Sequence, residues 1–182
     1  MFRRRRSSEA DPLAQVDPTA APRRFARSVA DAVAARRRFR DLVTGLRPGP
    51  VRDRLEGMAA QVDAGVSAVW ETVQRAAEME RILAALDPER VTAELKAARR
   101  SDATAEVQAA HEARFGSVQR LLNALDDTEQ RLRLIDVRLG AAVARAAEVA
   151  LGSGSVADDL DAELAGVVDD LGALRAGLDE VG

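Results

Sequence analysis

Residues 118–149, VQRLLNALDDTEQRLRLIDVRLGAAVARAAEV, decide the fold of this chain. The apolar and small residues of this stretch follow one another at alternating spacings of three and four: Val118, Leu121, Leu125, Thr128, Leu132, Ile135, Leu139, Ala142, Ala146 and Val149. This spacing places them on one side of an α-helix, as in a coiled coil. Charged residues flank the stripe, so the stretch predicts a long helix with one buried side.

The rest of the chain carries the same helical pattern. Apolar residues recur at helical spacing in three other segments, 23–46, 51–86 and 155–182. Asp87-Pro88 predicts the start of a further helix that runs to residue 150, with Ser101-Asp102 as a place where it could break. Aromatic residues make up only 3% of the chain, which disfavours a β-sandwich. We therefore predict an all-α protein, a long antiparallel helical hairpin or coiled-coil bundle of about four helices.

Composition divides the chain into three parts. Residues 1–22 contain three X-Pro steps among small and charged residues, which predicts a disordered, arginine-rich arm. Residues 23–150 are expected to form an elongated coiled-coil domain of three helices. Residues 151–182 are expected to form a hinge at Gly152-Ser153-Gly154-Ser155 and an acidic C-terminal helix.

An antiparallel hairpin that closes at Asp87 leaves the best heptads uncovered. At about 1.5 Å per residue, a helix over 51–86 is about 54 Å long and reaches only to about residue 123. The remaining stripe is covered either by the chain's own first and last helices or by the same stripe of a second copy, which we favour. The predicted association seam is Val118, Leu121, Leu125, Leu132, Ile135 and Leu139, together with Leu164, Leu171 and Leu178 of the last helix.

Charge is distributed unevenly along the chain, although the net charge is only −3. Residues 1–54 hold 14 arginines and six acidic residues, whereas residues 151–182 hold eight acidic residues and Arg175 alone. Two arginine clusters are the candidate anion-binding residues: Arg3, Arg4, Arg5, Arg6, Arg36, Arg37, Arg38 and Arg40.

Three partners fit this basic region. An anionic membrane would attract each arginine by about 1 kcal/mol, with Phe2, Phe25, Phe39 and Leu42 seated in the interface. Nucleic acid would be bound non-specifically through its phosphates, but aromatic residues spaced for base stacking are missing, so it is less favoured. The third partner is the acidic end of this chain or of a neighbour, which would also allow head-to-tail assembly.

The sequence offers no catalytic pattern. Cysteine is absent, which excludes disulfides, thiolate metal sites and cysteine nucleophiles. His111 is the only histidine and is expected to be a solvated surface residue. Adjacent acids such as Asp126-Asp127 point about 100° apart on a helix and do not converge on a metal. We therefore expect no enzyme, no cofactor, no metal and no small-molecule substrate.

The basic N-terminus is not followed by an apolar run, and no stretch approaches the length of about 20 apolar residues that spans a bilayer. A cytoplasmic protein that can lie at the inner face of the membrane is expected. The predicted function is a non-enzymatic helical scaffold or adaptor that self-associates through coiled-coil seams and contacts an anionic, foremost membrane, surface through its basic N-terminal region. The alternatives are a nucleic-acid-associated helical protein and a structural subunit of a larger protein complex that docks through its C-terminal helix.

Overall fold

The computed structural model describes residue 13, residues 15–152 and residues 156–181. Within these residues the chain is all-helical and has no strand, as the sequence predicts. One 3₁₀ turn precedes five α-helices, one more than the predicted number of about four: η1 (Pro18–Ala20), α1 (Ala26–Gly45), α2 (Pro50–Leu86), α3 (Pro88–Arg100), α4 (Ala105–Ala150) and α5 (Val156–Val181).

The structure describes part of the predicted arm, residue 13 and residues 15–22. Leu13 is buried against the main apolar core, and Asp17 caps η1 by accepting a hydrogen bond from the Thr19 amide at 2.8 Å. This part of the predicted arm is therefore held by an apolar anchor and a local cap. Arg3, Arg4, Arg5 and Arg6 lie outside the described residues.

The chain does not reverse at Asp87, and the predicted hairpin that closes there is wrong. Asp87 adopts a left-handed backbone conformation (φ 51°), and its side chain accepts a hydrogen bond from the Arg90 amide at 3.1 Å. This cap ends α2 and starts α3. The two helices touch each other little, so the chain changes direction here without folding back on itself. The reversal lies at residues 101–104, where Thr104 caps α4, so α2 packs beside the heptads of α4 instead of beside α3.

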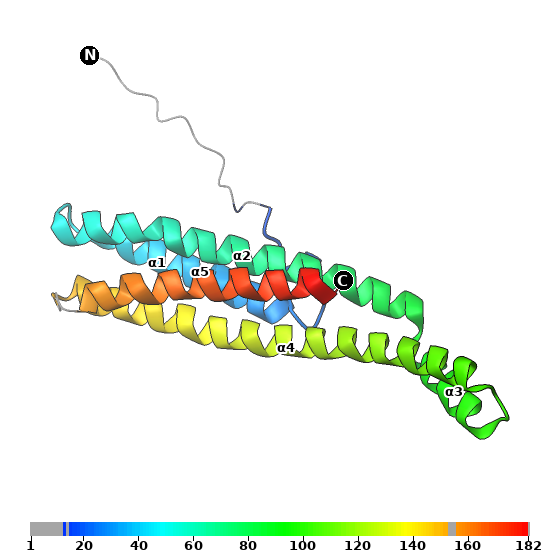
Figure 1. Cartoon of the computed structure of the whole chain (residues 1–182). Coiled ribbons are helices and arrows are strands. Elements are labelled where there is room, and N and C mark those ends of the chain that lie inside the picture. Colours follow the sequence, from blue (N-terminus) through cyan, green and yellow to red (C-terminus); the bar gives the residue numbers. More distant parts are fainter. Residues whose placement is uncertain (1–12, 14, 153–155, 182) are drawn as a thin grey trace, which may run out of the picture.

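Four helices, α1, α2, α4 and α5, lie side by side and share one apolar core (Figure 1). Consecutive helices of this set run in opposite directions, so α1 and α4 are parallel neighbours, as are α2 and α5. Within the described residues α1 and α5 do not touch each other, because each packs against both α2 and α4. They therefore occupy opposite flanks of the four-helix part.

The predicted association seam is buried inside this single chain. Val118, Leu121, Leu125, Leu132, Ile135 and Leu139 of α4, and Leu164, Leu171 and Leu178 of α5, are all buried. Gly65 of α2 lies where three helices meet, since a Cβ there would be 3.8 Å from both Leu139 and Val167. The chain's own helices therefore cover the stripe, and this seam does not require a second copy.

Beyond the four-helix part, α3 and the first turns of α4 (residues 105–117) project as an antiparallel pair, which we call the extension (Figure 1). Val91, Leu95 and Ala98 are its buried α3 residues, and of these only Val91 belongs to the main core. Ion pairs cross the extension between Arg99 and Glu112 at 2.9 Å and between Arg114 and Glu94 at 2.7 Å. The extension is held by far less apolar contact than the four-helix part.

Candidate anionic-surface interface

The predicted arginine cluster of α1 divides between two faces of the helix. Arg36 is only 12% exposed and donates from Nε to Asp63 of α2 at 2.7 Å. Arg40 pairs with the second oxygen of the same carboxylate. These two predicted anion-binding residues therefore fasten α1 to α2. Arg36 already interrupts the apolar spacing of α1 in the sequence, and this was the signal that it faces inward.

Arg37 and Arg38 do face solvent. Arg37 is 85% exposed and lies 3.9 Å from Asp41, whereas Arg38 donates from Nε to the carbonyl of Ala34 at 3.2 Å. Two further exposed arginines were missed by the sequence reasoning: Arg27 of α1, which is 92% exposed and lies 3.5 Å from Asp31, and Arg23, which precedes the helix. Both stand outside the runs of arginine, and only the helical angle between Arg27 and Arg38 could have identified Arg27. We call Arg23, Arg27, Arg37 and Arg38 the basic flank.

Arg24 holds the first turn of α1 against the other helices. Its Nη2 lies 2.7 Å from Asp126 and 2.8 Å from Glu129, both on α4. The hydrogen bond from Arg24 lowers the pKa of the Glu129 carboxyl. The Arg24 guanidinium also stacks 5.3 Å from the centroid of the Phe25 ring. Arg24 is therefore a structural arginine, although it adjoins the basic flank.

Of the apolar residues expected to seat in a membrane interface, Phe2 lies outside the described residues, and the other three are not free to do so. Phe25 and Phe39 are fully buried in the main core, and Leu42 is half-buried against it. Their spacing on α1 serves packing on α2 and α4, so that part of the prediction is wrong. The basic flank can contact an anionic surface through charge, without aromatic insertion.

The acidic residues of α5 lie on the opposite side of the molecule from the basic flank. The exposed members, which we call the acidic flank, are Asp159, Asp161, Asp169, Asp170, Asp179 and Glu180. Those that form ion pairs reach α2 and α4, as when Arg75 lies 2.8 Å from Asp179 and Arg138 pairs with Asp170. The ion pairs described for Arg27 and Arg37 of the basic flank are local, to Asp31 and Asp41 of α1, and none described for this flank reaches α5.

A groove of about 530 Å³ separates α1 from α4 along the edge of the basic flank. Arg27, Arg38 and Arg133 line it together with Asp136 of α4. One oxygen of Asp136 is buried without a hydrogen-bond partner. Burial raises the pKa of Asp136 to about 6 and nearby Asp31 adds to the rise, while a hydrogen bond from Ser28 and the charge of Arg27 oppose it. This carboxyl therefore titrates near pH 6.

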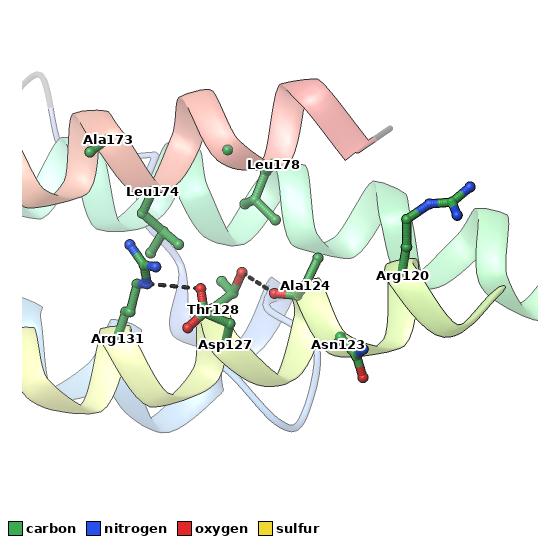
Figure 2. A pocket seen from close by; sticks show the side chains of 10 residues that line it. Arg120, Asn123, Ala124, Asp127, Thr128, Arg131, Ala173, Leu174 and Leu178 are labelled. Carbon is green, nitrogen blue, oxygen red and sulfur yellow. Dashed lines mark hydrogen bonds and ion pairs between the residues drawn. The ribbon is translucent and has the colours of Figure 1, made fainter. Parts of the chain in front are cut away.

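A second hollow, of about 370 Å³, lies between α4 and the C-terminal half of α5 (Figure 2). Leu174 and Leu178 point from α5 toward Thr128, whose hydroxyl donates to the carbonyl of Ala124 at 2.7 Å. Arg131 stands at the rim, 2.8 Å from Asp127. The floor is apolar and the rim is charged, which suits an apolar side chain better than a polar metabolite.

The described residues form no cluster of metal-ligating side chains. No group of three or more His, Asp and Glu side chains in this part of the chain is placed to hold a metal ion. His111 lies on the extension near Glu94. Among the described helices none is long and apolar enough to cross a membrane.

Comparison with known proteins adds no relative: no protein-family model, no curated protein and no solved structure matches the chain. The geometry of the flanks and grooves is therefore the basis for a function.

Proposed function

We propose that this chain is a non-enzymatic helical adaptor that contacts an anionic surface, foremost the phosphate-bearing face of a membrane, through its basic flank. The observation that carries the proposal is the position of α1 and α5 on opposite flanks of the four-helix part. This position leaves the arginines of the basic flank available to an outside anion. The same position keeps the acidic flank from repelling that anion at close range.

The arginines Arg3 to Arg6 precede this flank in the chain and add four positive charges on its N-terminal side. Each arginine near an anionic bilayer contributes about 1 kcal/mol, so the flank and these residues together supply the affinity of a peripheral contact. Since no aromatic residue of α1 is free to insert, binding is electrostatic and falls as salt is added. Nucleic acid remains the runner-up, because its phosphates would be contacted in the same way.

The test is co-sedimentation with vesicles of phosphatidylglycerol and phosphatidylcholine, beside vesicles of phosphatidylcholine alone, over a salt series. The variant Arg27→Gln/Arg37→Gln/Arg38→Gln removes three charges from the basic flank. The matched control, Arg81→Gln/Lys96→Gln/Arg100→Gln, removes three exposed charges from α2 and α3. A mobility-shift assay with duplex DNA is run with the same three proteins.

We expect the unaltered protein to bind only the anionic vesicles, and the flank variant to bind at least about tenfold more weakly. The control should keep most of the affinity. Equal losses in both variants would mean that net charge, and no particular flank, drives the contact. Binding to DNA without binding to vesicles would establish the runner-up instead. A protein that binds neither would leave a protein complex, docked through α5, as the remaining function.

A further inference from the structure

One stretch of α4 turns apolar side chains outward. Leu134 is 57% exposed and Val137 is 69% exposed, although both lie on the four-helix part where other large apolar residues are covered. They sit on the side of α4 that faces away from the buried seam. No helix that the structure describes covers them.

A hollow that could receive such a side chain lies on the same helix. The α4/α5 hollow exists because α5 carries Ala173 and Gly177 at its edge, and a Cβ at Gly177 would meet nothing within 4 Å. It continues past Arg131 and Ala173 into a smaller hollow of about 260 Å³ beside Leu134. Leu134 and the α4/α5 hollow are therefore about two turns apart along α4.

We propose that two copies of this chain pack α4 against α4 in antiparallel orientation, about a two-fold axis beside Gln130, with Leu134 of each copy entering the α4/α5 hollow of the other. In a two-fold antiparallel pair, a residue of one copy faces the residue of the other copy for which the two residue numbers add up to a fixed sum. The α1 side of one α4 then lies next to the α1 side of the other, and the α5 sides also lie next to each other. An axis between Glu129 and Gln130 sets Leu134 opposite the region between Asn123 and Asp127 of the second copy.

Charges agree with this register. Asp126 and Arg133 both lie on the α1 side of the outer face of α4, since Asp126 pairs with Arg24 and Arg133 lines the groove beside α1. The same axis sets Arg133 of one copy opposite Asp126 of the other, twice per dimer. A parallel pair in register would instead set Leu134 beside Leu134 and Arg133 against the α5 side of the other copy, leaving both hollows empty.

The inference does not depend on the proposed function, because the outer face of α4 contains no residue of the basic flank. It also replaces the predicted seam, which is buried within one chain. Since like sides meet, the two copies of α1 lie on one side of the pair and the two copies of α5 on the other. The dimer would thus present both basic flanks to a single surface.

The absence of cysteine makes a sharp register test possible, because one introduced cysteine is the only thiol in the protein. Gln130→Cys lies at the axis, so its two copies meet. Gln119→Cys lies on the same outer face but about 32 Å from its own copy along the helix, at about 1.5 Å per residue. Both full-length variants are treated with a short bismaleimide over a range of protein concentrations.

We expect a covalent dimer from Gln130→Cys and almost none from Gln119→Cys. Cross-linking of both variants would indicate a parallel pair and overturn the proposal. Cross-linking of neither, with both thiols shown to react with a monofunctional maleimide, would overturn it as well.

Light scattering supplies the second readout. Leu134→Asp should weaken dimerisation at least tenfold, whereas Leu151→Asp, an exposed leucine about 32 Å from the axis, should leave it unchanged. Arg133→Asp and Asp126→Arg should each weaken the dimer, and the double variant should recover it. Helix content by circular dichroism checks that each variant is folded. A folded, unaltered protein that stays monomeric at the highest soluble concentration would end the proposal.

Discussion

The helix α4 passes through two regions of the molecule that differ in how many helices surround it. In the four-helix part, after Val118, it is packed by α1, α2 and α5, and its stripe of leucines is buried throughout. In the extension, it is packed by α3 alone, and residues such as Val107 are exposed. The heptad pattern is regular where three neighbours bury it and fades where only one does. Pattern strength along a helix thus reports the number of its neighbours.

The largest difference between the two regions is expected from a pair of leucine-to-alanine substitutions. Leu132→Ala opens a cavity in the main core and should lower the free energy of unfolding by about 3–4 kcal/mol. Leu95→Ala in the extension should lower it by less, about 2 kcal/mol, because Leu95 is buried but lies outside the main core. Urea unfolding followed by circular dichroism measures both. Equal losses would mean that the extension is as well packed as the four-helix part.

Amide hydrogen exchange compares the two regions without substitution. The amides of α3 and of residues 105–117 should exchange about 30-fold faster than those of α4 beyond Val118, which corresponds to about 2 kcal/mol between local and global opening. The physical reason is the small apolar area that holds the extension. Equal protection from exchange along the whole of α4 would contradict this prediction.

The two regions should also respond differently to pH. Asp136 in the four-helix part has a folded pKa of about 6 against its ordinary 3.8, so its stabilising contribution is full below pH 3.8 and is lost as the pH rises through 6. Asp136→Asn should therefore stabilise the protein by about 1 kcal/mol above pH 7, allowing for partial exposure, and have little effect at pH 4. Thermal unfolding across this range measures the difference.

Glu94 in the extension is the matched control. The hydrogen bond from Arg90 lowers the pKa of Glu94, so its contribution is present above its ordinary value of 4.5 and is lost as the pH falls through the folded pKa. Glu94→Gln should accordingly have its effect at neutral pH, in the destabilising direction. A gain in stability at neutral pH from Glu94→Gln would show that this assignment is mistaken.

The smallest expected effects come from two glycines that face open space or ordinary contact. A Cβ at Gly172 of α5 would meet nothing within 4 Å, so Gly172→Ala should raise the free energy of global unfolding by about 0.5–1 kcal/mol. Gly116→Ala, whose Cβ would lie 3.7 Å from Arg120, should slow hydrogen exchange in the extension instead. A shift of the global midpoint by Gly116→Ala would mean that both regions unfold together.

The helical nature of the chain and the buried side of each helix follow from residue spacing alone. The period of the stripe in α4 identifies the same residues that the structure buries, because a heptad pattern records which side of a helix is packed. Residue spacing does not predict the direction that the chain takes after each helix break. Asp87-Pro88 and residues 101–104 both stop a helix, but a local cap carries no information on which break turns the chain around. That depends on which pairing of whole helices buries more apolar surface.

The site was less accessible to sequence reasoning than the fold. Arg36, Arg37, Arg38 and Arg40 form a single run in the sequence, yet the helix turns two of them toward Asp63 and two toward water. The carboxylate of Asp63, which is distant in the sequence, determines which arginines face inward. The residues around the arginine run give no indication of this partner. Arg27 was overlooked because clusters were sought along the chain instead of around the helix.

The separation of α1 from α5 gives the molecule an electric dipole across its narrow width. Near a negatively charged plane, such a dipole produces a torque that rolls the rod about its long axis until α1 faces the plane. A rod oriented in this way lies flat, with α5 directed to the opposite side along its whole length. Orientation then precedes contact, and salt that screens the field would randomise the roll before it abolishes the encounter.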